Sequence, residues 1–175
     1  MPQQEETATD SQVVELLGRS HLIGELLRAG LEVAVPARDR GVDLIAYADL
    51  SDQVSMFFAR PIQMKAASNR VFGINQKYKR VRELLLVYVW HLQTSEPIEA
   101  FALSYEEAVE VGRKMGYTRT ASWRSGAYTT TRPSARLRVL LEPFRMDPTR
   151  WWNLVVPQAV KAGRRSKRNR PTPAR

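Results

Sequence analysis

The spacing of apolar residues in the first third of the chain predicts one helix followed by three strands. From Ser11 to Gly30 the apolar residues recur every three or four positions, which is the period of an amphipathic helix. Ser11 is a good helix cap, and Gly30 tolerates the left-handed backbone that often ends a helix. Three apolar runs follow, and we expect each to form a strand: residues 31–35, 42–50 and 54–66.

The middle of the chain predicts two more strands and a second helix. Residues 84–90 form a dense apolar run typical of a buried strand, and residues 100–103 predict another. Ser104 and Glu107 have the spacing of a capping box, which predicts a helix from there to about Met115. This order of elements predicts an α/β fold with a mixed central sheet flanked by helices.

Other segments give weaker signals. Pro61 lies inside the third apolar run and favours a bulge or a sheet edge there. Residues 67–82 are basic, with a short helix expected around residues 76–82. Residues 117–135 are rich in Ser, Thr, Gly and Arg, so we expect a loop. Residues 151–156 are apolar enough to pack back onto the body of the protein.

Length and composition point to one domain between flanking tails. The chain has 175 residues, of which 43% are hydrophobic, which is enough for one core. We expect a disordered lead over residues 1–10, a single domain over residues 11–160, and a basic disordered tail over residues 161–175. No apolar run is long enough for a transmembrane helix, and the acidic start is unlike a signal peptide. The absence of cysteine excludes disulfides and fits the cytoplasm.

The charge distribution predicts a phosphate-rich partner, most directly DNA. The formal net charge is +9, from 27 Lys and Arg against 18 Asp and Glu. Residues 53–82, 111–141 and 148–175 contain bases but no acid, and such stretches attract polyanions. The alternative interpretation is that these bases serve solubility and form a basic tail.

Two sets of side chains inside these stretches are candidates for nucleic-acid contact. Tyr117, Trp123 and Tyr128 lie among arginines, where they either pack in the core or stack on a base. The basic side chains expected to contact phosphates are Arg70, Lys77, Lys79, Arg80, Arg82, Arg124 and Arg132.

Three polar residues on neighbouring predicted strands form the candidate site. Gln63 and Lys65 are two residues apart, so on a strand they point to the same face. Asp43 opens the preceding strand and can reach that face across the hairpin. A carboxylate, an amide oxygen and an ammonium at one point suit a metal and a phosphate. Alternatively, Asp43 caps its strand or pairs with Arg38 or Arg40, while Gln63 and Lys65 are exposed strand residues.

These segments resemble the PD-(D/E)XK nuclease superfamily, in a variant in which Gln replaces the acid of the second motif. The resemblance covers roughly residues 11–103 and implies a restriction-endonuclease-like fold. It is carried by the first helix and three segments: residues 30–36, Arg40-Gly41-Val42-Asp43-Leu44-Ile45 and Ile62-Gln63-Met64-Lys65.

The resemblance implies a role for each matched residue. Asp43 matches the metal-binding aspartate, and Gln63 matches the second ligand, through its carbonyl oxygen. Lys65 matches the lysine that positions water or stabilises charge on the phosphate. The implied cofactor is Mg²⁺ or Mn²⁺. The superfamily often adds a glutamate on the first helix, and Glu15 and Glu25 are the candidate ligands here, although neither matches its position cleanly.

The leading hypothesis is therefore a metal-dependent endonuclease, a hydrolase acting on DNA phosphodiester bonds. A second hypothesis is a non-catalytic nucleic-acid-binding or regulatory protein that keeps the nuclease fold. A third is an assembly module whose basic faces bind an acidic protein. No membrane partner is expected, and a homodimer is left open.

Overall fold

The computed structural model describes residues 11–38, 40–48 and 56–157. The expected lead, residues 1–10, and the expected tail, residues 161–175, lie outside the described residues. Among the described helices, none is long and apolar enough to cross a membrane. The elements are α1 (Ser11–Arg28), β1 (Glu32–Ala34), β2 (Leu44–Ala48), β3 (Phe58–Ala66), β4 (Phe72–Asn75), the 3-10 helix η1 (Gln76–Arg80), β5 (Leu85–Trp90), β6 (Glu99–Ser104), α2 (Tyr105–Lys114), η2 (Tyr117–Arg119), α3 (Ala121–Arg124), β7 (Ala127–Thr130), α4 (Ala135–Leu141), η3 (Glu142–Phe144) and α5 (Pro148–Val155).

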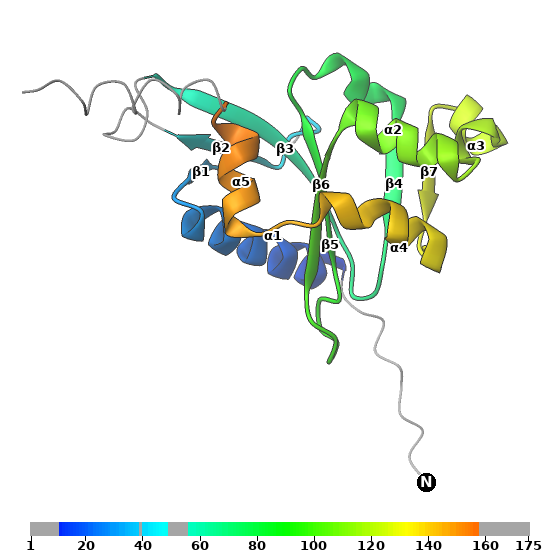
Figure 1. The fold of residues 1–175 in the computed structure, drawn as a ribbon, viewed down its shortest axis with the longest axis horizontal. Helices are drawn as coiled ribbons and strands as arrows, with labels where there is room; N and C mark the ends of the chain where they lie inside the picture. The colour runs from blue at the N-terminus through cyan, green and yellow to red at the C-terminus, as the bar shows by residue number, and fades with distance from the viewer. Residues whose placement is uncertain (1–10, 39, 49–55, 158–175) are drawn as a thin grey trace, which may run out of the picture.

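The main sheet has five strands in the order β1-β2-β3-β5-β6. The first three form an antiparallel meander, β5 runs parallel to β3, and β6 returns antiparallel to β5. The connection from β3 to β5 passes through β4 and η1, which cross over one face of the sheet (Figure 1). The predicted α/β class, with a mixed sheet flanked by helices, is confirmed.

Helices cover both faces of this sheet. On one face, Leu22 and Leu26 of α1 and Trp151 of α5 pack against the meander, and all three are fully buried. On the other face, α2, α4 and the small β4–β7 sheet pack against β5 and β6 (Figure 1). Because alternate residues of a strand point to opposite faces, β3 directs Met64 toward α1 and its neighbours in sequence toward the β4 side.

Several local predictions are confirmed. Ser104 caps α2, its side chain accepts a hydrogen bond from the Glu107 amide, and the Glu107 carboxylate accepts from the Ser104 amide. All six residues of β5 are buried, as the apolar run predicts. The segment 151–156 packs onto the body: its first five residues belong to α5, and Val156 follows the helix.

The prediction of a sheet edge at Pro61 is confirmed locally, because β3 has a partner strand on only one side at this residue. Pro61 lies in β3, the central strand, and pairs with Ile45 of β2. Ile62 is the first β3 residue to pair with β5, and its carbonyl faces β2. Successive residues of a strand direct their amides to opposite sides, so the Pro61 nitrogen faces the side on which β5 lies. The pairing with β5 starts only at the next residue, Ile62. No ladder hydrogen bond is lost there.

The prediction of a loop over residues 117–135 is wrong. This segment contains η2, α3 and β7, and β7 pairs antiparallel with β4 over Phe72–Asn75. The helix expected around residues 76–82 is the shorter η1, and the strand β4 before it was not predicted. Each of these two strands has four residues and is stabilised by a partner far away in sequence, so neither leaves a strong local pattern.

Candidate functional site

The Asp43 side chain continues the β2–β3 ladder at the point where β2 begins. The Asp43 amide donates to the Ile62 carbonyl at 2.8 Å. The next amide of β3 on that side is that of Met64, and it donates to Asp43 Oδ2 at 2.6 Å. The carboxylate therefore replaces a main-chain acceptor, which fixes it beside β3.

Gln63 completes a cluster of hydrogen-bonding atoms around this carboxylate. Its Nε2 donates to Asp43 Oδ2 at 2.6 Å and to the Met64 carbonyl at 3.1 Å. Rotation of the amide by half a turn would bring its oxygen beside the two acceptors. Three oxygens would then face one another, and only a cation or a shared proton would hold them together.

Lys65 follows on the same face of β3 as Gln63. A Cβ placed on Gly73 of β4 would lie 3.3 Å from Lys65 Cε, so the lysine stem passes closely over a glycine. Burial lowers the pKa of Lys65, Lys77 lowers it further, and the negative charge of Asp43 opposes both. The sequence spacing thus brings an acid, an amide and an ammonium to one region of the sheet.

Tyr78 of η1 packs beside Gly41, two residues before Asp43. Its ring is buried, and a Cβ placed on Gly41 would lie 3.2 Å from it and 3.8 Å from Gln63 Oε1. Gly41 has a φ of 92°, which a residue with a side chain rarely adopts. The Lys77 ammonium lies 5.0 Å from the Tyr78 ring centroid. The glycine thus permits an aromatic ring to pack closely against the backbone before Asp43, and the neighbouring Lys77 is the second cation near Lys65.

The two glutamates predicted as additional ligands pair with arginines of their own helix. Glu15 accepts from Arg19 at 2.5 Å, and Glu25 accepts from Arg28 at 2.6 Å. Helix α1 packs on the face of β3 that carries Met64, not on the face of Gln63. Within residues 11–38, 40–48 and 56–157, no three His, Cys, Asp or Glu side chains form a group that could hold a metal. The role of Glu15 and Glu25 as metal ligands therefore stays a prediction.

The atoms around Asp43 nevertheless suit one kind of ion. A carboxylate, an amide oxygen and the Met64 carbonyl are hard donors, and the Gln63 amide group lies within hydrogen-bond distance of the other two. Mg²⁺ takes oxygen ligands, often through only one or two carboxylates, and keeps several waters. The donor set fits a weakly held Mg²⁺ or Mn²⁺ once the Gln63 amide turns its oxygen toward Asp43.

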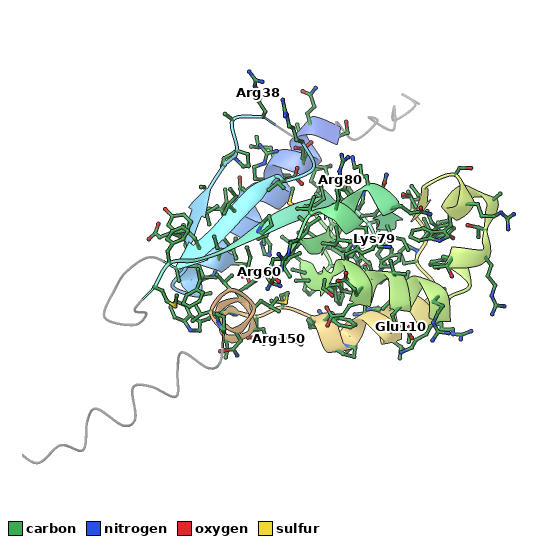
Figure 2. The ribbon with its side chains drawn as sticks, turned by 90° about the horizontal axis from the view of Figure 1, so that it is seen from above. Arg38, Arg60, Lys79, Arg80, Glu110 and Arg150 are labelled. Atoms are coloured by element: carbon green, nitrogen blue, oxygen red, sulfur yellow. The ribbon has the colours of Figure 1, made fainter. Side chains whose placement is uncertain are left out.

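The predicted phosphate-binding residues divide into separate regions. Lys77, Lys79 and Arg80 lie on η1 and are exposed, and Figure 2 labels the last two. Of the three, Lys77 is close enough to Lys65 to lower its pKa. Arg70 is half-buried instead, and it contacts His91 at 3.4 Å and Glu96 at 3.5 Å. The remaining three are exposed: Arg82 before β5, Arg124 at the end of α3 and Arg132 after β7.

The aromatic residues of residues 117–130 pack against each other. The Tyr117 and Tyr128 rings stack with centroids 4.1 Å apart and an interplanar angle of 18°. Both rings, together with Trp123, are half-buried against the β4 side of the core. This geometry favours the core interpretation over base stacking, because the ring faces of the two tyrosines already have a partner.

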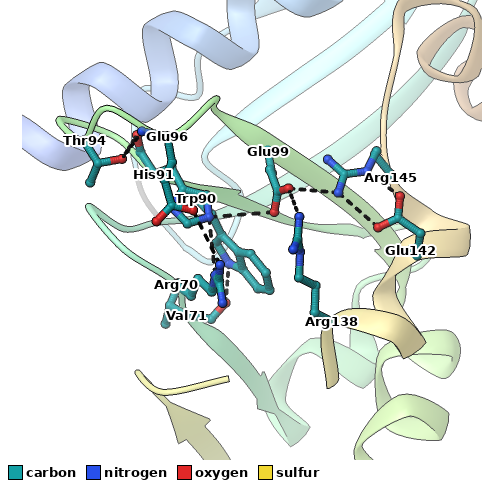
Figure 3. A network of polar contacts seen from close by, with 10 residues as sticks. All are labelled: Arg70, Val71, Trp90, His91, Thr94, Glu96, Glu99, Arg138, Glu142 and Arg145. Carbon is teal, nitrogen blue, oxygen red and sulfur yellow. Dashed lines mark hydrogen bonds and ion pairs between the residues drawn. The ribbon is translucent and has the colours of Figure 1, made fainter. Parts of the chain in front are cut away.

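A second polar cluster has no counterpart in the sequence predictions. Glu99 of β6 is buried, and its Oε1 accepts from Arg138 Nη2 at 2.5 Å and from Arg145 Nη2 at 2.9 Å (Figure 3). Burial alone would raise the pKa of Glu99, but the hydrogen bonds and charges of the two arginines lower it overall. These residues lie far apart in sequence. The one available signal was an acid directly before a predicted apolar strand.

Comparisons with protein-family models, curated proteins and solved structures found no match to this chain.

Proposed function

We propose that this chain is a metal-dependent nuclease-like protein that acts on DNA phosphodiester bonds and has a restriction-endonuclease-like fold. The observation that carries the proposal is the placement of Asp43, Gln63 and Lys65 on one face, at the start of β2 and in β3. The helix before the sheet, the antiparallel meander and the mixed five-stranded sheet support this proposal.

Each residue has a proposed part. Asp43, the Gln63 amide oxygen and the Met64 carbonyl would hold Mg²⁺ or Mn²⁺, which neutralises charge on a phosphate when bound. The Lys65 ammonium would lie against the same phosphate, where its lowered pKa reflects burial beside another cation. The exposed bases of η1 would attract the backbone and set its position.

A specific observation also favours the non-catalytic alternative. Asp43 Oδ2 already accepts two hydrogen bonds, one from the Met64 amide and one from the Gln63 amide. In this arrangement the Gln63 amide takes the place that a cation would occupy beside Asp43. The Asp43 carboxylate then stabilises the pairing of β2 with β3. A nucleic-acid-binding protein that lost catalysis would keep such a closed cluster.

Nicking of supercoiled plasmid with Mg²⁺ or Mn²⁺ distinguishes the nuclease proposal from the non-catalytic alternative. We expect Asp43→Ala and Lys65→Ala each to reduce nicking by at least about 100-fold, while DNA affinity changes by less than roughly threefold. The matched control is Lys114→Ala, which removes a lysine that is 51% exposed at the end of α2 and leaves nicking intact. A wild type that is inert on plasmid and on branched DNA with every divalent ion would contradict the nuclease proposal.

Gln63→Glu tests the metal site without activity. Two carboxylates in contact repel each other, so we expect the variant to be less stable than wild type in EDTA. A divalent ion that binds the folded state raises Tm, and this rise should be larger for Gln63→Glu because a carboxylate is the stronger ligand. Equal Tm values with and without Mn²⁺, in both proteins, would favour the non-catalytic alternative.

A further inference from the structure

Gly73 of β4 is the point where the small β4–β7 sheet meets the face of β3 that carries Lys65. The Tyr88 hydroxyl of β5 donates to the Gly73 carbonyl at 2.8 Å, which fixes β4 over the main sheet. A Cβ on Gly73 would lie 2.8 Å from Thr129 Oγ1 and 3.3 Å from Lys65 Cε. The absence of a side chain on Gly73 thus lets the Thr129 hydroxyl and the Lys65 stem approach the same point.

The polar ends of these two side chains have unused hydrogen-bonding capacity. Within the part of the chain that the structure describes, neither the Lys65 ammonium nor the Thr129 hydroxyl forms a hydrogen bond or an ion pair with another side chain. Lys65 is half-buried and Thr129 is exposed. An ammonium offers three donors and a hydroxyl offers one, so the two together can hold a group with several acceptor oxygens.

The small sheet belongs to a part of the molecule that contains no acid. The pairing of β4 with β7 brings together residues 67–82 and 116–136, which contain nine Lys and Arg and no Asp or Glu. Arg70 pairs with Glu96 at 3.5 Å. The other eight form no ion pair with any described residue, so their charge is not cancelled within that part of the fold. The negative charge that acts on Lys65 comes from Asp43, before β2.

We propose that Thr129 and Lys77 complete, together with Lys65, a binding site for a phosphate group of the DNA backbone. The Thr129 hydroxyl and the Lys65 ammonium would each donate to a phosphate oxygen, and the Lys77 ammonium would neutralise the remaining charge. The identity of the ligand as DNA rests on the proposed function, whereas the site itself needs neither metal nor cleavage.

The surroundings of Lys65 favour an anion of this kind. Burial is the largest cause of its lowered pKa, and the like charge of Lys77 is the second. The ammonium has therefore lost water that no described side chain replaces, and an anion beside both lysines would offset both effects. A single carboxylate could do the same for Lys65 alone. A chain of phosphates also meets the unpaired bases around the small sheet.

Inorganic phosphate, titrated into the full chain in EDTA and followed by its amide NMR signals, tests the site. We expect saturable shifts centred on Lys65, Gly73 and Thr129. Thr129→Val keeps the shape of the side chain but removes the hydroxyl, so phosphate affinity should fall at least about threefold, as it should in Lys77→Ala. Thr129→Ser keeps the hydroxyl and should bind phosphate like wild type.

The matched control is Thr149→Val, which changes an exposed threonine of α5 on the opposite face of the main sheet. It should leave phosphate affinity unchanged. Shifts spread evenly over all exposed bases would overturn the proposal. A Thr129→Val variant that binds phosphate as tightly as wild type would overturn it too.

A short DNA duplex identifies the source of the phosphate. The duplex should displace inorganic phosphate and shift the same amides. Displacement by polyglutamate but not by the duplex would overturn the proposal in favour of an acidic protein. The two proposals can fail separately. Phosphate binding that Thr129→Val weakens, in a protein that never cleaves DNA, supports this site and contradicts the nuclease proposal. Cleavage by a protein whose phosphate affinity is insensitive to Thr129→Val does the reverse.

Discussion

At the scale of single residues, Glu99 shows how one buried acid organises a surface. Its Oε1 holds two arginines, Arg138 and Arg145, that come from segments distant in sequence (Figure 3). Glu99 has a lowered pKa, so the folded state holds its proton less tightly than the unfolded state does. Its ion pairs therefore stabilise the fold above the ordinary carboxyl pKa of 4.5, and this contribution is lost as the pH falls through the lowered value.

We expect Glu99→Gln to lower the free energy of unfolding by about 1–2 kcal/mol at neutral pH. The lower end of this range allows for the partial exposure of Arg138 and Arg145 to solvent, which weakens their ion pairs with Glu99. The difference between the two proteins should shrink as the pH falls below the carboxyl range, because wild-type Glu99 then also becomes neutral. Urea unfolding at neutral and at acid pH measures it. A difference that is constant with pH would show that the ion pairs are not its cause.

At the scale of elements, replacement of two glycines of α1 by alanine is expected to change stability in opposite directions. A Cβ on Gly18 would lie 2.6 Å from Ala66 Cβ, which cannot move without the strand. A Cβ on Gly24 would meet only the flexible Arg28 side chain, at 3.4 Å. Gly18 therefore sets how closely the helix approaches β3, whereas Gly24 has no such contact.

We expect Gly18→Ala to destabilise the protein by about 1–3 kcal/mol through overpacking. Gly24→Ala, the matched control, should stabilise it by up to about 1 kcal/mol because alanine favours helix. The measurement is the midpoint of urea unfolding for the two variants and wild type. If both variants shifted the midpoint in the same direction, the close approach of α1 to β3 would not be limiting.

Elements with a strong local signal were predictable, and elements made by distant pairing were not. The apolar run of β5 and the Ser104–Glu107 capping box each lie within a few residues. Strands β4 and β7 depend on each other across the sequence. Pro61 indicated a sheet edge, but the side of β3 that lacks a partner there depends on where β5 begins.

The candidate site was likewise predictable where its signal is local in sequence and unpredictable where it depends on packing. The two-residue spacing of Gln63 and Lys65 gave their shared face. The hydrogen bond of the Met64 amide to Asp43 and the packing of Tyr78 beside Gly41 depend on the three-dimensional fold, so no spacing could indicate them.

At the scale of the whole molecule, the excess of positive charge predicts DNA binding with little sequence preference. The logarithm of affinity should fall linearly with the logarithm of salt concentration, with a slope of roughly −0.9 per phosphate neutralised. Deletion of residues 161–175, which contain seven Lys and Arg, should make the slope shallower without abolishing binding. Fluorescence anisotropy over a salt series measures both slopes. Affinity that does not change with salt would contradict the expectation.

The burial of Trp151 against the face that α1 covers has a consequence for synthesis on the ribosome. Helix α1 is synthesised early. Helix α5 packs into the same hydrophobic cluster, but it is synthesised only after nearly all the described chain has been made. At ordinary translation rates this leaves a wait of roughly 10 s. The nascent α1 and meander must pass that interval with apolar surface uncovered, where a chaperone or a neighbouring chain can reach it first.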